Sequence, residues 1–252
     1  MPECPTVFLH GFGGAPAAWQ PVIDAWPSNR PPLITPRLPG HGAAIDGIAR
    51  FDDAIDALIA RLPDRMNLVG YSLGGRLALG IAHRFRSKVA RLALIGANPG
   101  IDAAARPSRR QTDEDWARQL QAEGVEAFFD RWIQQPLFAT QRALPAEVLA
   151  RQRAWRAHLD PRDLATTMRA LSLSAMPDYR PTLGDLDMPV LLMVGAQDHK
   201  FRAISESMMA HLPNAQLDVV DNVGHNVPLE APALVALRLA RFLSVGSAQN
   251  DG

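Results

Sequence analysis

Three residues that together can perform nucleophilic or base catalysis occur in this chain in the order serine, aspartate, histidine. Ser72 is the central residue of Gly70–Gly74, a Gly-x-Ser-x-Gly pattern, and Asp198 and His225 each follow an apolar run late in the chain. A serine hydroxyl is a weak nucleophile or base unless a histidine takes its proton, and the histidine needs a carboxylate to fix its tautomer. We therefore predict a catalytic triad of Ser72, His225 and Asp198.

The surroundings of Ser72 predict a strand, a very tight turn and a helix. The apolar run Met66–Val69 precedes the serine, and a helical pattern, Leu77–Ala82, follows it. Glycine is needed at positions 70 and 74 because a side chain there would collide with a neighbouring strand or helix where the turn is sharpest. Such a turn lifts the serine hydroxyl clear of the sheet and places it at a helix N-terminus, where negative charge is favoured.

The alternative readings of the other two residues are structural. Asp198 could be a turn-forming carboxylate and His225 a loop cap, but both follow late strands in the order that the triad requires. The glycine-rich segment His10–Gly14 follows the first predicted strand, so the backbone N–H groups of Phe12 and Leu73 are the expected oxyanion hole. The alternative for this segment is an ordinary flexible turn between a strand and a helix.

Arg76 lies four residues after Ser72, one helical turn further along on the same face. A cation near the start of a buried helix opposes the helix dipole and costs desolvation. Arg76 could pair with a core carboxylate or face solvent, or it could bind a substrate carboxylate beside the serine. Further arginines follow at 106, 109, 110, 151, 153 and 156; two or three of them facing inward would indicate a polyanionic substrate.

Apolar runs of strand length alternate with helical patterns at both ends of the chain, which indicates an α/β fold with a mostly parallel sheet flanked by helices. The expected strands are 6–9, 33–38, 66–70, 89–96, 189–195 and 216–220, and the expected helices are 17–26, 51–62 and 231–245.

No strand is expected between about 102 and 182, where amphipathic helical pieces such as Asp113–Glu123, Val125–Gln134, Ala146–His158 and Asp163–Leu173 are separated by prolines, Pro107 among them. We interpret 102–181 as a helical cap (lid) inserted into a core formed by 1–101 and 182–252.

Composition excludes several classes of function. Among 252 residues, Lys plus Arg and Asp plus Glu both total 26, so no nucleic-acid or anionic-membrane surface is indicated. No apolar run approaches the roughly 18 residues of a membrane span. The single cysteine, Cys4, fits a reducing compartment, and a strand beginning at Thr6 leaves no room for a signal peptide. We expect a cytoplasmic protein with a small-molecule substrate, no cofactor, no metal and no obligate protein partner.

These features together resemble the α/β-hydrolase superfamily over essentially the whole chain. Within it, the sequence is similar to the menaquinone-pathway synthases that make 2-succinyl-6-hydroxy-2,4-cyclohexadiene-1-carboxylate. The segments that carry this resemblance are Gly70–Arg76, Pro99-Gly100 with the arginine-rich stretch before Asp113 and Trp116, Trp132–Pro136 with Phe138, Asp198–Arg202, and Gly224–Asn226. The Trp-Ile-Gln-Gln-Pro stretch at 132–136 and the Asp-His-Lys-Phe-Arg stretch at 198–202 are the most distinctive of them.

The resemblance implies an elimination rather than a hydrolysis. The family's substrate carries several carboxylates and an enolpyruvyl ether, and its triad serine acts as a base that removes a ring proton before pyruvate leaves. In this chain the base would be Ser72, and the oxyanion donors would hold a carboxylate or the developing enolate. The substrate-binding positions implied by the resemblance are Tyr71, Arg76, Arg109, Trp132 and Arg156.

Two other functions remain open on sequence grounds. A carboxylesterase or carbon–carbon bond hydrolase would use the same triad through an acyl-serine intermediate, and fold alone does not separate it from the synthase. Buried arginines would separate the two, because a neutral ester has no use for them. A non-catalytic binding protein on this fold would be expected to have lost a triad residue, and all three are present.

Overall fold

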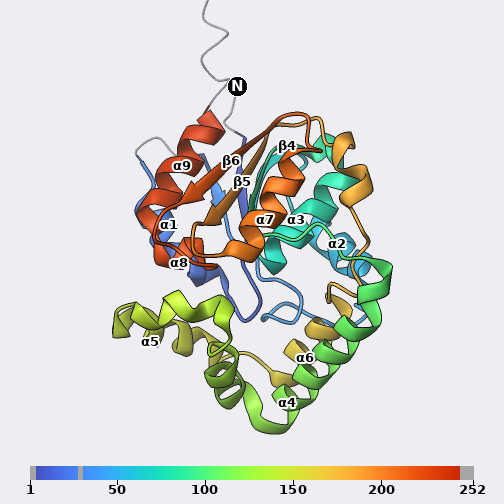
Figure 1. The fold of residues 1–252 in the computed structure, drawn as a ribbon, viewed down its shortest axis with the longest axis vertical. Helices are drawn as coiled ribbons and strands as arrows, with labels where there is room; N and C mark the ends of the chain where they lie inside the picture. The colour runs from blue at the N-terminus through green and yellow to red at the C-terminus, as the bar shows by residue number, and fades with distance from the viewer. Residues whose placement is uncertain (1–3, 28–30, 245–252) are drawn as a thin grey trace, which may run out of the picture.

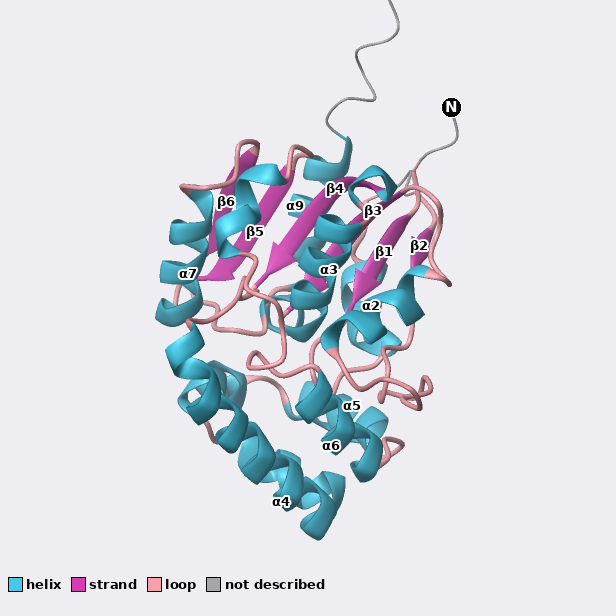
Figure 2. Cartoon of the chain, turned by 90° about the vertical axis from the view of Figure 1, so that its right-hand side faces the viewer, coloured by secondary structure: helices cyan, strands magenta, loops and turns pink. Residues whose placement is uncertain are grey.

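Short apolar runs form one parallel sheet in the computed structural model, which describes residues 4–27 and 31–244. The sheet has six strands in the order β2-β1-β3-β4-β5-β6, which can be followed from the labels in Figure 2. Their bounds are β1 Thr6–Leu9, β2 Leu33–Ile34, β3 Met66–Tyr71, β4 Val89–Ile95, β5 Val190–Gly195 and β6 Ala215–Val220. All six predicted strands form. The prediction that the second one extends to residue 38 was wrong, because Pro36 and Pro39 lack the N–H group that a strand must donate.

Helices cover both faces of the sheet (Figure 2). One face packs against α2 (Phe51–Ile59), α3 (Leu73–Arg84) and α7 (His199–Met209), and the other against α1 (Gln20–Asp24), α8 (Val227–Glu230) and α9 (Pro232–Ser244). Neighbouring residues of β3 show the consequence: Leu68 belongs to the first apolar cluster and Val69 to the second. Burial on both faces explains why the strands are continuously apolar rather than alternating.

Short 3₁₀ segments complete the secondary structure of the described residues: η1 Pro16–Trp19, η2 Arg86–Lys88, η3 Ala103–Ala105, η4 Pro136–Ala143 and η5 Arg180–Asp185. The helix expected at 17–26 is therefore η1 followed by α1, and α7 was not predicted. Across 4–27 and 31–244, no helix combines the length and apolar character needed to cross a bilayer.

The helices α4 (Arg106–Trp132), α5 (Ala146–Arg156) and α6 (Pro161–Ala170) lie beyond the end of the sheet toward which the strands point (Figures 1 and 2). Gly124 has non-helical angles, φ 78° and ψ 175°, so α4 is kinked where the sequence predicts a boundary between two helices. The expected break at Pro107 and start at Asp113 were wrong. Pro107 lies in the first turn of α4, where no N–H donor is needed.

The segment 102–181 has an apolar cluster of its own. Leu120 and Phe128 of α4 pack with Leu164 of α6, and Arg169 makes a two-bond ion pair with Glu114 at 2.6 and 3.0 Å. The end of the segment behaves differently, because residues from Ala170 onward join the cluster beneath α2 and α3. These helices are thus packed together and anchored at their C-terminal end to the sheet layer.

The strand order creates a crevice at the centre of the sheet. From β1 the chain leads outward to β2, whereas from β3 it leads through α3 to β4 on the other side. Ligands bind outside the carboxyl ends of parallel strands where the connections diverge in this way. Pairing of Leu9 with Gly70 brings the loop after β1 level with the turn that carries Ser72.

Candidate active site

Ser72 occupies a strained turn between β3 and α3. Its φ is 51° and its ψ is −109°, values that a residue with a side chain rarely adopts. A Cβ atom on Gly74 would overlap the carbonyl of Leu9, and one on Gly70 would overlap the Gly74 carbonyl, which confirms the collision predicted for both glycines. The turn is held by the Ser72 N–H group, which donates to the Ile95 carbonyl at 2.9 Å.

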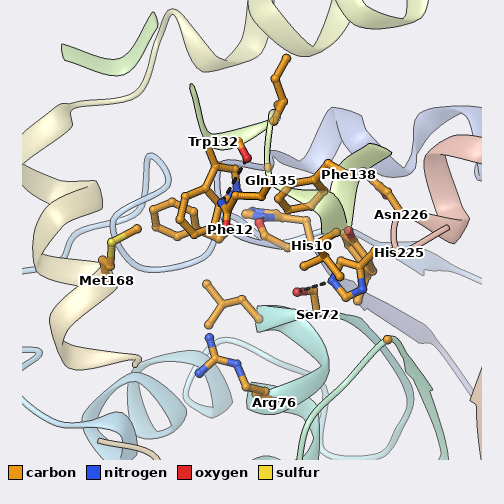
Figure 3. Close-up of a pocket in the computed structure, with 18 of the residues that line it drawn as sticks. His10, Phe12, Ser72, Arg76, Trp132, Gln135, Phe138, Met168, His225 and Asn226 are labelled. Atoms are coloured by element: carbon orange, nitrogen blue, oxygen red, sulfur yellow. Dashed lines mark hydrogen bonds between the residues drawn. The ribbon is translucent and has the colours of Figure 1, made fainter. Parts of the chain in front are cut away.

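The structure brings the three predicted triad residues together from three separate loops, and Figure 3 shows two of them, Ser72 and His225. His225 Nε2 lies 3.2 Å from Ser72 Oγ, and His225 Nδ1 lies 2.6 Å from Asp198 Oδ2. Asp198 Oδ1 accepts a bond from the Phe201 N–H group at 3.2 Å, and the Phe201 ring lies 4.4 Å from the imidazole. With the neutral ring donating its Nδ1–H group to Asp198 Oδ2, Nε2 is free to accept the proton of the serine hydroxyl.

The predicted oxyanion donors lie on either side of the serine. Leu73 is the first residue of α3, so its N–H group has no partner within the helix. The loop after β1 approaches closely, since a Cβ on Gly11 would lie 3.6 Å from the Ser72 Cβ. Within the described residues, the N–H groups of Phe12 and Leu73 donate to no protein acceptor. Both are therefore available to an oxygen atom of a ligand.

The buried His41 ring contacts the loop after β1 through a hydrogen bond. Its Nε2 accepts a bond from the Gly13 N–H group at 3.0 Å, while its Nδ1 lies 3.1 Å from the Pro39 carbonyl. This pattern requires the neutral ring with the proton on Nδ1. Burial lowers the pKa of His41 to about 4, and burial with the adjacent His41 ring lowers that of His10 to about 3. His41 therefore supports the loop that carries the Phe12 N–H group.

Acid should destabilise the fold through these two rings. Their folded-state pKa values lie below the unfolded value of about 6.5, so only the unfolded chain takes up their protons as the pH falls from 6.5 toward 4. Each buried histidine then costs up to about 1.4 kcal/mol per pH unit. We expect urea unfolding between pH 7 and 5 to show a shallower loss of stability for His41→Gln than for the wild type. His211→Gln, at an exposed histidine, is the control; equal pH dependence in wild type and His41→Gln would contradict the prediction.

A cavity of about 330 Å³ opens above Ser72, between the sheet and the helices α4 to α6. All five residues that were predicted to bind substrate line it: Tyr71, Arg76, Arg109, Trp132 and Arg156. The predicted triad residues Ser72 and His225 line it as well. Of the remaining arginines considered from sequence, 106, 110, 151 and 153 do not line this cavity. Three arginines therefore face one cavity with the serine.

Arg76 reaches from α3 toward the cavity (Figure 3). Its Nη1 donates to the Leu171 carbonyl at 2.5 Å, and among the described residues no carboxylate pairs with it. Burial and the neighbouring Arg109 lower the pKa of Arg76 to about 9. The alternative of an ion pair with a core carboxylate is therefore wrong. Asp113, which is paired with Arg109, acts on Arg76 without pairing with it and raises its pKa against the effect of burial.

The other two arginines come from the helices above. Arg109 Nε lies 2.7 Å from the buried Asp113 Oδ2, which also accepts a bond from the Ser172 hydroxyl at 2.5 Å. Arg156 lies over the Phe129 ring at 4.2 Å and donates to the Gly13 carbonyl at 3.3 Å. Burial lowers the pKa of Arg156 to about 10. Each guanidinium is held by a protein group while it lines the cavity.

Aromatic side chains form the rest of the wall. Trp132 stacks on Phe128 at 5.4 Å and lies 6.2 Å from Phe138, while Tyr71 is tilted against His225 at 5.4 Å. Burial raises the pKa of Tyr71. Gln135 and Lys200 also line the cavity. They belong to the distinctive motifs, but their orientation toward the cavity was missed because nothing local in the sequence indicates it.

Comparison with known proteins identifies the family of the chain. Residues 6–238 match the model of the alpha/beta hydrolase family. A 2-succinyl-6-hydroxy-2,4-cyclohexadiene-1-carboxylate synthase of Klebsiella pneumoniae subsp. pneumoniae is 36% identical over 244 residues, which cover 94% of this chain and 93% of the relative. The structure of MenH from S. aureus matches with a TM-score of 0.90 at 30% identity, over 95% of this chain and 93% of that one.

The fold is also shared with a solved structure of lower sequence identity. A thermophilic esterase from Thermogutta terrifontis matches with a TM-score of 0.81 at 24% identity, over 96% of this chain and 89% of that one, which shows the fold alone. The family model spans residues 6–238, and the match to the Klebsiella synthase covers 94% of the chain. The chain belongs to the alpha/beta hydrolase family and, within it, to the 2-succinyl-6-hydroxy-2,4-cyclohexadiene-1-carboxylate synthases.

Proposed function

We propose that this protein is a lyase that eliminates pyruvate from 2-succinyl-5-enolpyruvyl-6-hydroxy-3-cyclohexene-1-carboxylate to give 2-succinyl-6-hydroxy-2,4-cyclohexadiene-1-carboxylate. The observation that carries the proposal is the set of three arginines on the cavity of a triad-bound serine. A guanidinium binds a carboxylate through two parallel hydrogen bonds, and the proposed substrate carries several carboxylates. A neutral ester would leave Arg76, which makes no ion pair with a described carboxylate, without an anionic partner.

Ser72 is the proposed base. Its Oγ removes a proton from the substrate ring while its own hydroxyl proton passes to His225 Nε2, 3.2 Å away. The electron pair of the broken C–H bond forms a ring double bond to C3. The existing C3=C4 pair shifts to C4=C5, and the C5–O bond to the enolpyruvyl group breaks with its electron pair leaving on oxygen. The departing pyruvate enolate takes the proton from His225, which returns the triad to its starting state. Asp198 stabilises the imidazolium in between.

The remaining groups orient and stabilise the substrate. The N–H groups of Phe12 and Leu73 would donate hydrogen bonds to a carboxylate or to the developing enolate oxygen. Donors that are already in place stabilise negative charge as it develops in the transition state. Arg76, Arg109 and Arg156 would bind carboxylates from three sides, with Trp132 against the apolar ring edge and Tyr71 beside the base. Together these groups would orient the substrate so that its ring proton lies next to Ser72 Oγ.

We further propose that 102–181 acts as a cap over a core formed by 1–101 and 182–252, because α4 and α5 supply two of the three arginines. The proposed partner is a small polycarboxylate. The balance of acidic and basic residues speaks against nucleic acid or an anionic membrane, and the single cysteine fits a cytoplasmic location.

Pyruvate release tests the proposal. Purified protein is expected to liberate pyruvate from the enolpyruvyl substrate, measured by coupling to lactate dehydrogenase, in one-to-one ratio with the cyclohexadiene product. Short-chain nitrophenyl esters serve as the comparison, because an esterase would hydrolyse them rapidly through an acyl-serine. Rapid ester turnover with no pyruvate release would overturn the synthase function in favour of the hydrolase one.

A further inference from the structure

Glu230, the last residue of α8, reaches back to the loop that carries His225. Its Oε2 accepts a bond from the Gly224 N–H group at 2.8 Å, and its Oε1 accepts one from the Asn226 N–H group at 3.1 Å. The two donors flank His225 on either side. One carboxylate therefore holds the backbone of the residue before and the residue after the histidine.

Glu230 bonds to the backbone on either side of His225, whereas the other contacts of His225 described above involve its imidazole ring. Asp198 and Phe201 contact the imidazole ring, and Gly96 leaves room beside it, since a Cβ there would lie 3.0 Å from Cε1. Those contacts restrain rotation of the ring but leave the position of its Cα atom to the loop. The loop between β6 and α8 has no secondary structure of its own, and Asn222 within it adopts a positive φ of 60°.

The geometry also explains why a carboxylate is needed here. Two N–H groups converge on one side chain, and an ionised carboxylate offers an acceptor oxygen to each, which makes both bonds charge-assisted. The short helix α8 brings Glu230 within reach because its own N–H group donates to the Asn226 carbonyl at 2.9 Å. The loop and α8 thus form one closed unit around the histidine.

We propose that Glu230 is a positioning residue for His225: its carboxylate fixes the loop backbone so that Nε2 stays in hydrogen-bond range of Ser72 Oγ. The inference rests on the proposed catalytic role of His225 and not on the identity of the substrate. A distance of 3.2 Å leaves little tolerance, because a displacement of about 1 Å at a reacting group costs on the order of 100-fold in rate.

Two substitutions test this. Glu230→Ala removes both acceptors, and we expect kcat for pyruvate release to fall about 10- to 100-fold while KM stays within about twofold. Glu230→Gln keeps one acceptor oxygen and turns an amide N–H₂ toward the other donor, so its kcat should lie between those of alanine and wild type. Glu206→Ala, at an exposed glutamate of α7 that pairs with Arg202, is the matched control and should match wild type.

A second readout needs no substrate. The proton between His225 Nδ1 and Asp198 Oδ2, 2.6 Å apart, should give a far-downfield ¹H NMR resonance in the wild type that broadens or disappears in Glu230→Ala. If wild type released no pyruvate, this resonance alone would decide the role of Glu230. A wild-type kcat or an equally sharp resonance in Glu230→Ala would overturn the proposal. If Glu230→Ala did not fold, a wild-type kcat in Glu230→Gln would do so.

Discussion

Ser72→Ala is expected to lower kcat for pyruvate release by about 10³-fold or more, because it removes the atom that takes the ring proton and general base catalysis contributes about 10²- to 10⁴-fold. Alanine keeps the Cβ atom, so the strained backbone at φ 51° and the turn that it forms should persist. KM should change little, since the arginines that bind the carboxylates remain. Steady-state kinetics with the coupled pyruvate assay measures both constants.

Two checks make this result specific. Ser207→Ala, at an exposed serine of α7, should retain wild-type activity. Circular dichroism and thermal unfolding should show that Ser72→Ala is folded. Mass spectrometry of the wild type during turnover should show no covalent adduct on Ser72, because a base is not acylated. More than about a tenth of wild-type kcat in Ser72→Ala would contradict the base role, and a trapped adduct would favour an acyl-serine mechanism.

Arg76→Ala is expected to lower kcat/KM for the enolpyruvyl substrate about 10- to 150-fold and to leave turnover of any neutral ester nearly unchanged. A hydrogen bond to a charged group contributes about 1.5–3 kcal/mol, and each 1.4 kcal/mol is a factor of ten. Arg76 lines the cavity and makes no ion pair with a described carboxylate, so a substrate carboxylate is the partner that its charge lacks. Arg76→Lys should recover only part of the loss, because lysine keeps the charge without the planar fork.

The matched control is Arg84→Ala on the same helix. Arg84 pairs with Asp56 at 2.7 Å and does not line the cavity, so its removal should leave both reactions unchanged. Arg109→Ala is expected to have a smaller effect than Arg76→Ala, since Asp113 already compensates part of the Arg109 charge. Equal losses on the anionic substrate and on a neutral ester would mean that Arg76 is structural, acting through its bond to the Leu171 carbonyl.

Local patterns in the sequence predicted the α/β architecture and three residues of which one, His225, lies within hydrogen-bond range of the other two, Ser72 and Asp198. Each of these inferences depended on near neighbours: Gly70 and Gly74 permit the sharp turn at Ser72, and an apolar run directly precedes Asp198. The steric limits of a tight turn and the apolar character of a buried strand both depend on a few consecutive residues. They can therefore be predicted without knowing the rest of the fold.

Residue patterns alone left open which arginines face the cavity; the family resemblance implied Arg76, Arg109 and Arg156, and the tertiary structure places these three on it. Arg109 and Arg110 differ by about 100° around a helix, and the orientation of α4 depends on its kink at Gly124 and on its packing against α6.

The tertiary structure also decided that His41 and Glu230 support the site. His41 accepts a hydrogen bond from one backbone N–H group and Glu230 from two, and all three donors lie in loops. The conformation of a loop depends on contacts between segments that are distant in the sequence.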